Sequence, residues 1–177
     1  MIDLVAKSPA AGLLPVTVGA STLSEQPVTQ IYSIAPFKGA HVSTALKKAV
    51  GLGLPNVGGS KSKDGVEILW AARGQYFLIG AKPPPLPAAI TDQSDAWCTV
   101  ALTGENTDHV MARLCPLDIA SMEHGDVARS LVGHMSAIIV KRKGGVTLMV
   151  FRAFAKTLVH DLQTAMRSVT AQATLPD

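Results

Sequence analysis

The sequence predicts an α+β fold of two layers, built from two ferredoxin-like halves of the split βαβ kind. Two pairs of apolar segments are separated by short glycine-containing turns, which predicts two β-hairpins, and apolar residues recur at helical spacing beside each of them. A hydrophobic content of 47% in 177 residues provides ample material for a core. We expect the first half at residues 28–94 and the second at 95–177, forming either two units or one compact domain.

The first elements come from proline content and apolar spacing. Residues 1–27 contain three prolines and many small residues without a sustained period, which favours an extended arm of the kind that lies on a partner. Residues 28–35 are rich in β-formers and predict a strand, and residues 39–50 repeat apolar side chains at helical spacing. Residues 51–65 contain five glycines and are expected to form a loop.

The first hairpin is predicted at residues 66–72 and 75–81, joined by a two-residue turn that contains glycine. Four prolines then follow between positions 83 and 87. Proline lacks a backbone N–H and fixes φ, so these residues predict a stiff turn. We expect the two halves to meet near residues 83–94.

The second half is predicted to begin with a strand and a helix. Residues 95–103 alternate enough for a strand, and a helix with Val110, Met111 and Leu114 facing inward follows it. Pro116 stops that helix, because proline cannot donate the hydrogen bond that would continue it.

The second hairpin is predicted at residues 133–143 and 146–152, closed by two glycines that readily adopt positive φ. The last helix begins near Ala153. One side of it is expected to carry six apolar residues and the other side four polar ones: Phe154, Leu158, Leu162, Ala165, Met166 and Val169 against Lys156, His160, Gln163 and Arg167. The complete predicted order is β-α-β-β-α-β-α-β-β-α.

The chain is short of charge. Its 16 Lys+Arg and 13 Asp+Glu make 16% of the residues, against about 25% in an average soluble domain. Few charges around much apolar material indicate that another protein covers part of the surface. We therefore expect protein partners.

Neither a membrane nor an export signal is expected. Charged residues or prolines interrupt every apolar stretch before the roughly 18 residues that a transmembrane helix needs. Residues 1–7 have no basic segment ahead of an apolar one, which predicts no signal peptide. Cys98 and Cys115 lie far apart, form no C-x-x-C pair and are expected to be reduced. These observations predict a cytoplasmic location.

A nucleic acid partner is not expected either. The net charge of +3 and isoelectric point near 9.0 are mildly basic, but the basic residues are scattered. The densest run is Lys141, Arg142 and Lys143 at a hairpin tip, where solvated side chains are the simpler interpretation. Aromatic residues make only 5% and do not interleave with this run.

Several motifs that could carry chemistry have simpler explanations. The glycines at positions 51 and 53 lack the third glycine of a dinucleotide turn and follow a helix, so Gly51 is better explained as a helix C-cap. The histidines at positions 41, 109, 124, 134 and 160 show no zinc-ligand spacing. His124 lies between Glu123 and Asp126, which suggests acid-base work, but a solvated loop is the simpler interpretation. No serine or cysteine has the sequence context of a nucleophile. We assign no catalytic, cofactor-binding or metal-binding residue.

One series of motifs carries a resemblance. Residues 102–104 (LTG) and 111–119 (MARLCPLDI) resemble the L-S-G…L-A-R-G-C-P-x-D-L pattern of the gamma subunit of heterotetrameric sarcosine oxidase. Residues 125–131 and 150–155 stand where that family has G-x-x-x-x-T-x-L and V-R-R-S-F-A. The likeness covers roughly residues 95–170, and the first 60 residues match only by their general order of elements. The departures are Leu114 for glycine, Ser130 for threonine and Ala153 for serine.

The resemblance implies a fold similar to that of folate-dependent aminomethyltransferases and a non-catalytic role. It implies a complex with alpha, beta and delta subunits, in which the other subunits carry FAD, FMN, NAD and zinc. That complex oxidatively demethylates sarcosine to glycine, transfers the one-carbon unit to tetrahydrofolate and forms hydrogen peroxide. Within this chain the motifs have packing roles: Asp118 is expected to bond nearby N–H groups, and Phe154 with Leu158 to fix the last helix.

Two alternatives stay open. The first is a free-standing folate-binding or aminomethyltransferase-like protein, which rests on fold analogy alone. Those transferases are longer, and related iron–sulfur assembly proteins carry a K-G-C-Y-x-G-Q-E stretch that is absent here. The second is a basic nucleic-acid-binding module.

Overall fold

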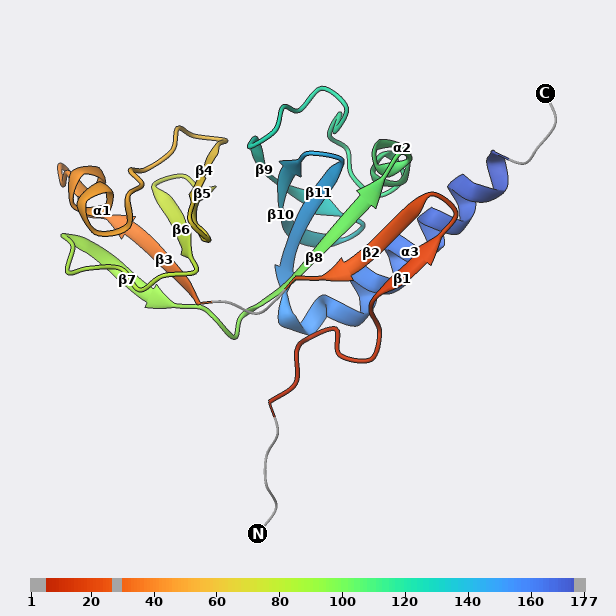
Figure 1. Ribbon diagram of the computed structural model, residues 1–177, viewed down its shortest axis with the longest axis horizontal. Coiled ribbons are helices and arrows are strands. Elements are labelled where there is room, and N and C mark those ends of the chain that lie inside the picture. The colour runs from red at the N-terminus through yellow and green to blue at the C-terminus, as the bar shows by residue number, and fades with distance from the viewer. Residues whose placement is uncertain (1–5, 27–29, 174–177) are drawn as a thin grey trace, which may run out of the picture.

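The computed structural model describes residues 6–26 and 30–173. Two antiparallel sheets dominate it (Figure 1). The six-stranded sheet contains, from edge to edge, β1 (Val16–Val18), β2 (Ser21–Glu25), β8 (Trp97–Gly104), β11 (Gly145–Phe151), β10 (Met135–Arg142) and β9 (Val127–Val132). The five-stranded sheet contains β4 (Ser60–Lys63), β5 (Val66–Ala72), β6 (Gln75–Ile79), β3 (Ile31–Pro36) and β7 (Ala88–Asp92).

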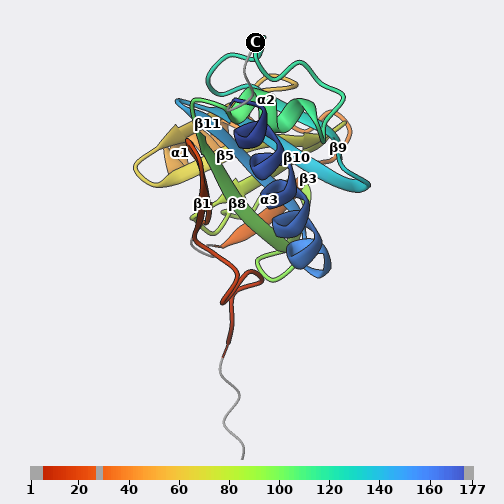
Figure 2. The same cartoon turned by 90° about the vertical axis from the view of Figure 1, so that its right-hand side faces the viewer.

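The helices cover the outer faces of the two sheets. Helix α1 (Val42–Val50) packs on the five-stranded sheet, and α2 (Thr107–Ala112) and α3 (Ala155–Gln172) pack on the six-stranded sheet. A short 3-10 turn, η1 (Arg152–Phe154), leads into α3, which crosses the sheet in the view of Figure 2. The α+β class with two sheet-containing halves is confirmed. No helix within the described ranges is long and apolar enough to cross a membrane.

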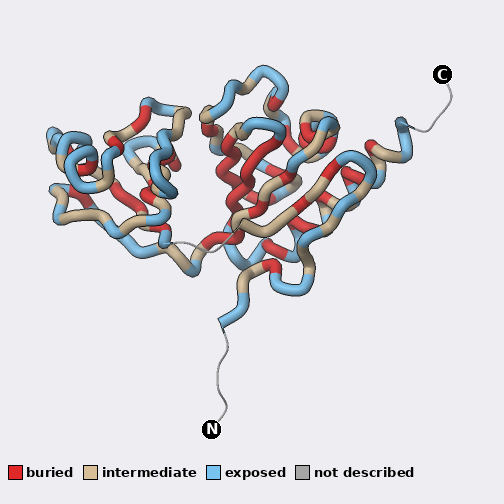
Figure 3. The backbone as a smooth tube through the Cα atoms, viewed as in Figure 1, coloured by how far each residue is buried: buried red, intermediate tan, exposed pale blue. Residues whose placement is uncertain are grey.

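Three apolar cores fill the spaces between these layers. One lies between the six-stranded sheet and its helices, one between α1 and the five-stranded sheet, and the third joins the inner faces of both sheets. Strands β10 and β11 are buried on both faces, as the red tube in the middle of Figure 3 shows. A strand buried on both sides needs a continuous apolar run, which is what the sequence has there.

Several predicted elements form for the reasons given. Hairpins β5–β6 and β10–β11 are confirmed, and Gly144 adopts a φ of +75° in the second turn. Gly51 is the left-handed C-cap of α1, and its N–H bonds to the Lys47 carbonyl. Asp118 accepts bonds from the N–H groups of Ala120 and Ser121, at 3.1 and 3.4 Å. The strand expected at residues 28–35 is present as β3, but positions 28 and 29 lie outside the described residues.

The N-terminal arm differs from the prediction. Residues 16–25 form the β1–β2 hairpin, and β2 pairs with β8 from Ser21 to Glu25. These residues therefore extend the sheet of the second half, far away in sequence. The short hairpin was missed because its strands have three and five residues and only Ser21 and Leu23 are buried in them.

Three further strands were missed, and one predicted helix is wrong. The loop expected at residues 51–65 contains β4, a polar edge strand held by its pairing with β5. The element order predicted from the sequence has a helix between the first hairpin and β8. Residues 88–92 instead form strand β7, whose last four residues are exposed. β9 completes the other sheet. These strands are held mainly by backbone pairing with their neighbours. Their sequences therefore need no strong apolar pattern, and they are hard to recognise from sequence.

The helix expected before Pro116 is only six residues long. Strand β8 runs on to Gly104, which pairs with Ser21, so the helix begins only after Asn106. A Cβ at Gly104 would lie 1.9 Å from the Ala20 carbonyl oxygen, which excludes any side chain there. Val110 and Met111 are buried as predicted, whereas Leu114 is half-buried beyond the helix end.

The apolar side of α3 is confirmed except at its start. Leu158, Leu162 and Met166 are at most 1% exposed. Phe154 precedes the helix and is 41% exposed, so its predicted packing role is wrong. It belongs to the η1 turn, which leaves its side chain outside the 3.6-residue repeat that begins at Ala155.

Candidate functional site

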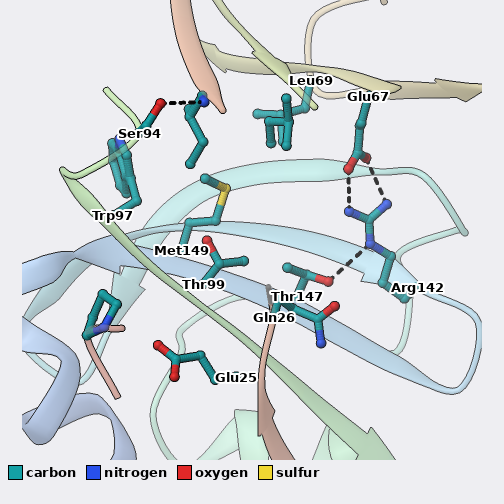
Figure 4. A pocket seen from close by; sticks show the side chains of 13 residues that line it. Glu25, Gln26, Glu67, Leu69, Ser94, Trp97, Thr99, Arg142, Thr147 and Met149 are labelled. Carbon is teal, nitrogen blue, oxygen red and sulfur yellow. Dashed lines mark hydrogen bonds and ion pairs between the residues drawn. The ribbon is translucent and has the colours of Figure 1, made fainter. Parts of the chain in front are cut away.

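The inner faces of the two sheets enclose a cavity of about 300 Å³ (Figure 4). Its wall combines both halves with the N-terminal segment, which makes it a candidate ligand site by position and size. The lining residues are Pro9, Glu25, Gln26, Ile31, Glu67, Leu69, Ile79, Ser94, Trp97, Thr99, Arg142, Thr147 and Met149.

An ion pair closes one side of the cavity and ties the sheets together. Arg142 of β10 donates two parallel bonds of 2.8 Å to the carboxylate oxygens of Glu67 on β5. Its Nε also donates to Thr147 Oγ1 at 3.1 Å (Figure 4). The side chains are 29% and 16% exposed, so the pair is largely shielded from water. Both charges are therefore committed to joining the halves.

Glu25, at the end of β2, holds the N-terminal segment against the cavity. Its carboxylate accepts a bond of 2.5 Å from the Ser8 hydroxyl and one of 2.9 Å from the Ala10 N–H. These bonds place Pro9 in the cavity wall. Among the described residues Glu25 forms no ion pair, so neutral donors alone satisfy it.

An aromatic group forms the wall beside β8. Trp97 meets Phe77 edge-on at 5.3 Å and stacks on Phe151 at 4.8 Å between ring centres. Its indole N–H donates to Gln93 Oε1 at 3.0 Å, and the Arg129 guanidinium lies over its ring at 5.9 Å. These four contacts hold the Trp97 ring in place, and its contact with Phe77 links the two sheets.

Ser94 fixes the segment that connects the halves. Its hydroxyl accepts a bond from the Ile31 N–H and donates one of 2.6 Å to Asp92 Oδ1, to which the Ser94 N–H also donates. The Ser94 hydroxyl bond, followed by the Ser94 backbone bond, lowers the pKa of Asp92. Asp92 is consequently an ionised turn-former.

The two cysteines are buried thiols. Cys98 is fully buried, and burial, with the negative charge of Glu25 as the second cause, raises its pKa to about 11. A thiol protonated at neutral pH is a poor nucleophile. Cys115 is 6% exposed and its Sγ lies 4.0 Å from Ser130 Oγ, a contact between two of the matched motifs.

The histidine candidates lie outside the cavity. All five histidines are exposed. Asp126 does not orient His124, because its carboxylate accepts a bond of 2.8 Å from the Glu123 N–H and closes its own turn. Within the described ranges no group of three His, Cys, Asp or Glu side chains is placed to hold a metal.

The basic run at the second hairpin is not a solvated tip. Lys141 pairs with Asp108 at 3.0 Å and donates to the Ile119 carbonyl at 2.9 Å, and Arg142 pairs with Glu67. Only Lys143 of the three is exposed. The run therefore holds α2 and the two halves in place.

Sequence reasoning missed the residues of this cavity. The available signal was Glu67, a carboxylate inside the otherwise apolar strand VEILWAA. A charge on the inner face of a strand requires a partner, and Arg142 supplies it from a segment 75 positions away.

Among comparisons with known proteins, the one with solved structures identifies the fold. No protein-family model matches the chain, and no curated protein matches it. Among solved structures it is similar to a chain of "Heterotetrameric Sarcosine Oxidase from Corynebacterium sp. U-96 in complex with pyrrole 2-carboxylate", with a TM-score of 0.79 and 20% identity. The match covers 97% of this chain and 98% of that one. This chain therefore has the fold of a chain of a heterotetrameric sarcosine oxidase.

Proposed function

We propose that this chain is the non-catalytic gamma subunit of a heterotetrameric sarcosine oxidase. The near full-length structural likeness carries the proposal, since it includes the N-terminal segment that the sequence motifs did not reach. The motif series between residues 95 and 170 and the charged fraction of only 16% support it independently.

The reaction proposed for the complex is oxidative demethylation of sarcosine to glycine. The one-carbon unit passes to tetrahydrofolate, and oxygen is reduced to hydrogen peroxide. FAD, FMN, NAD and zinc are proposed to lie on the other subunits. Two observations support this proposal: the glycines at 51 and 53 follow helix α1 instead of a strand, and in the described part of the chain no group of three His, Cys, Asp or Glu side chains is placed to hold a metal.

The proposed role of this chain is structural. Its charged cavity residues already serve internal contacts: Arg142 and Glu67 join the sheets, and Glu25 holds the N-terminal segment. These contacts join the two sheets into one scaffold, whose exposed surface meets the alpha, beta and delta subunits.

Co-expression tests the assignment. Expressed alone, the chain is expected to aggregate or to bind a hydrophobic dye strongly, because the partners that cover its apolar surface are missing. Co-expression with the three other subunits should abolish both effects. A well-behaved monomer with no affinity for those subunits would contradict the assignment.

Substitutions in the assembled oxidase test the absence of a catalytic group. His124→Ala and Cys115→Ala should leave turnover within a few-fold, because His124 is exposed outside the cavity and Cys115 packs against Ser130. A loss above about a hundredfold, nearly 3 kcal/mol of transition-state stabilisation, with assembly intact would overturn the non-catalytic role.

The cavity favours one second candidate, a free-standing folate-binding or aminomethyltransferase-like protein. Its volume of about 300 Å³ lies at the lower end of ligand pockets. Tight folate binding by the isolated chain, abolished by Glu25→Gln, would favour this candidate. Trp97 lines the cavity, so unchanged tryptophan fluorescence on addition of folate would dismiss this candidate.

A further inference from the structure

We propose that an exposed surface at one end of the six-stranded sheet docks another subunit of the complex, through a segment that presents an apolar side chain beside a carboxylate. We call it the aromatic–arginine surface and define it by five residues: Arg129, Leu131, Phe151, Arg152 and Phe154. This inference rests on the proposed function and adds the site of contact and the chemistry of the contacting segment.

The apolar part of this surface is unusual for the chain. Six large apolar side chains are exposed among the described residues, and three belong to this surface: Leu131 at 49%, Phe151 at 43% and Phe154 at 41%. Phe151 and Phe154 lie three positions apart in the exposed segment 151–154, and Phe151 keeps 43% of its surface exposed although Trp97 stacks on it. Exposed apolar groups gathered at one place mark interaction sites.

The strand register places Leu131 and Phe151 on one face. Phe151 is opposite Trp97, and Leu131 is opposite Ser136. The β10–β11 pairing of Ala137 with Val150, extended by one step, sets Ser136 opposite Phe151. Residues opposite each other in antiparallel strands point to the same side of a sheet. Both side chains therefore lie on the inner face, where Trp97 meets the other half.

Phe151 is held in place before any partner binds. Trp97, only 4% exposed, stacks on it at 4.8 Å with an interplanar angle of 27°. The Trp97 ring is fixed by Gln93 and Phe77. An anchored aromatic side chain loses little conformational freedom on association, so its contacts contribute fully to affinity.

Two guanidinium groups define the charge of the surface. Arg152 is 44% exposed and its nearest carboxylate, Asp95, lies 3.6 Å away and is itself 97% exposed. Within the described ranges, Arg129 donates to two neutral acceptors, the Ala71 carbonyl and the Ser136 hydroxyl, and lies over the face of Trp97. Arg152 Nη2 also donates to the Lys7 carbonyl at 2.7 Å. Because the Arg152–Asp95 pair is exposed, an incoming carboxylate can replace Asp95 there, and Arg129 has no carboxylate partner among the described residues.

This positive charge decides between two occupants. A second copy of the chain docked through the same surface would bring two guanidinium groups from each side together, with only Asp95 of each copy to offset them, which is unfavourable. A segment that carries a carboxylate next to an apolar side chain satisfies the arginines and covers the exposed apolar groups at once. Arginine with aromatic residues is also the composition enriched in interface centres.

The test measures binding of this full-length chain to the complex of the other three subunits. Leu131→Asp and Phe154→Asp should each raise the dissociation constant by about tenfold or more. The new carboxylate repels the incoming carboxylate and loses its hydration in the contact. Phe37→Asp is the matched control: Phe37 is 58% exposed in the other half, and its substitution should change binding less than about twofold. Arg152→Gln should slow association and reduce its dependence on salt.

The outcomes separate this inference from the proposed function. If the wild-type chain does not join the other subunits, the proposed function fails and the docking inference fails with it. If it joins and the Leu131 and Phe154 variants, with unchanged unfolding temperatures, bind as wild type, only the docking surface is wrong. A dimer of the isolated chain that Leu131→Asp dissociates would replace the proposed occupant with a second copy.

Discussion

The two faces of the six-stranded sheet are filled in different ways. The face toward α2 and α3 is covered by a continuous apolar core that includes Leu148, Leu158 and Leu162. The face toward the other sheet has a smaller apolar core, the cavity and the Arg142–Glu67 pair. The first face holds the second half together, and the second face is a joint between halves that combines apolar and polar contacts.

Neighbouring residues of one strand serve these different faces. In β10, Ala137 and Ile139 belong to the helix-side core, whereas Ile138 and Val140 belong to the core between the sheets. Alternation along a strand sends successive side chains to opposite faces, so a single apolar run supports both layers. Substitutions on the two faces should therefore have separable effects on stability.

The largest effect is expected on the helix side. Leu162→Ala removes methyl groups from a side chain that is 0% exposed and should lower the free energy of unfolding by about 2 to 5 kcal/mol. Denaturant unfolding of the chain measures this loss. An effect below about 1 kcal/mol would mean that α3 is not a core helix.

Cys98 makes the same core sensitive to alkaline pH. Its pKa of about 11 in the folded chain exceeds the ordinary 9.0, so the folded state retains a proton that the unfolded state releases. Retention of this proton stabilises the folded chain by up to about 2 to 3 kcal/mol. The stabilisation is fully present below pH 9 and is lost as the pH rises toward 11.

Denaturant unfolding between pH 8 and 11 measures this effect, with Cys98→Ala as the reference. Above pH 9, the free energy of unfolding of the wild type should fall relative to that of the Cys98→Ala variant. A constant difference over the whole range would contradict the raised pKa.

At the joint between the sheets a moderate effect is expected. Glu67→Gln leaves Arg142 without its carboxylate and should cost about 1 to 2 kcal/mol, between the values for exposed and buried ion pairs. A double-mutant cycle with Arg142→Gln should show a coupling of about 1 kcal/mol. Additive effects of the two substitutions would mean that the pair does not join the halves.

The smallest effect is expected at Phe154. The exposed side chain of Phe154 lies outside the apolar side of α3, so Phe154→Ala should change the unfolding free energy of the isolated chain by about 0.5 kcal/mol or less. A loss of unfolding free energy comparable to that of Leu162→Ala would mean that Phe154 is a core residue and does not belong to the proposed docking surface.

The central elements were predictable from sequence. β5, β6, β10 and β11 have apolar runs bounded by glycine turns, and the repeat from Leu158 to Val169 gave the buried side of α3. The apolar side chains of these elements are the ones that become buried, so the local sequence pattern predicts the element.

The peripheral strands and the cavity were not predictable in the same way. β2 and β7 are set by backbone pairing with strands distant in sequence, β8 and β3. β4 pairs with the neighbouring β5, but its side chains, like those of β7, are mostly exposed. The Arg142–Glu67 pair joins positions 75 residues apart. Tertiary contacts of this kind leave only indirect local signals, such as a lone charge within an apolar strand.

Purification of the tagged chain after co-expression tests the central claim most directly. The account predicts that three other polypeptides elute with it in one complex that shows yellow flavin absorbance. Elution of the chain by itself, folded and without flavin absorbance although the other subunits are present in the same cells, would contradict the assignment.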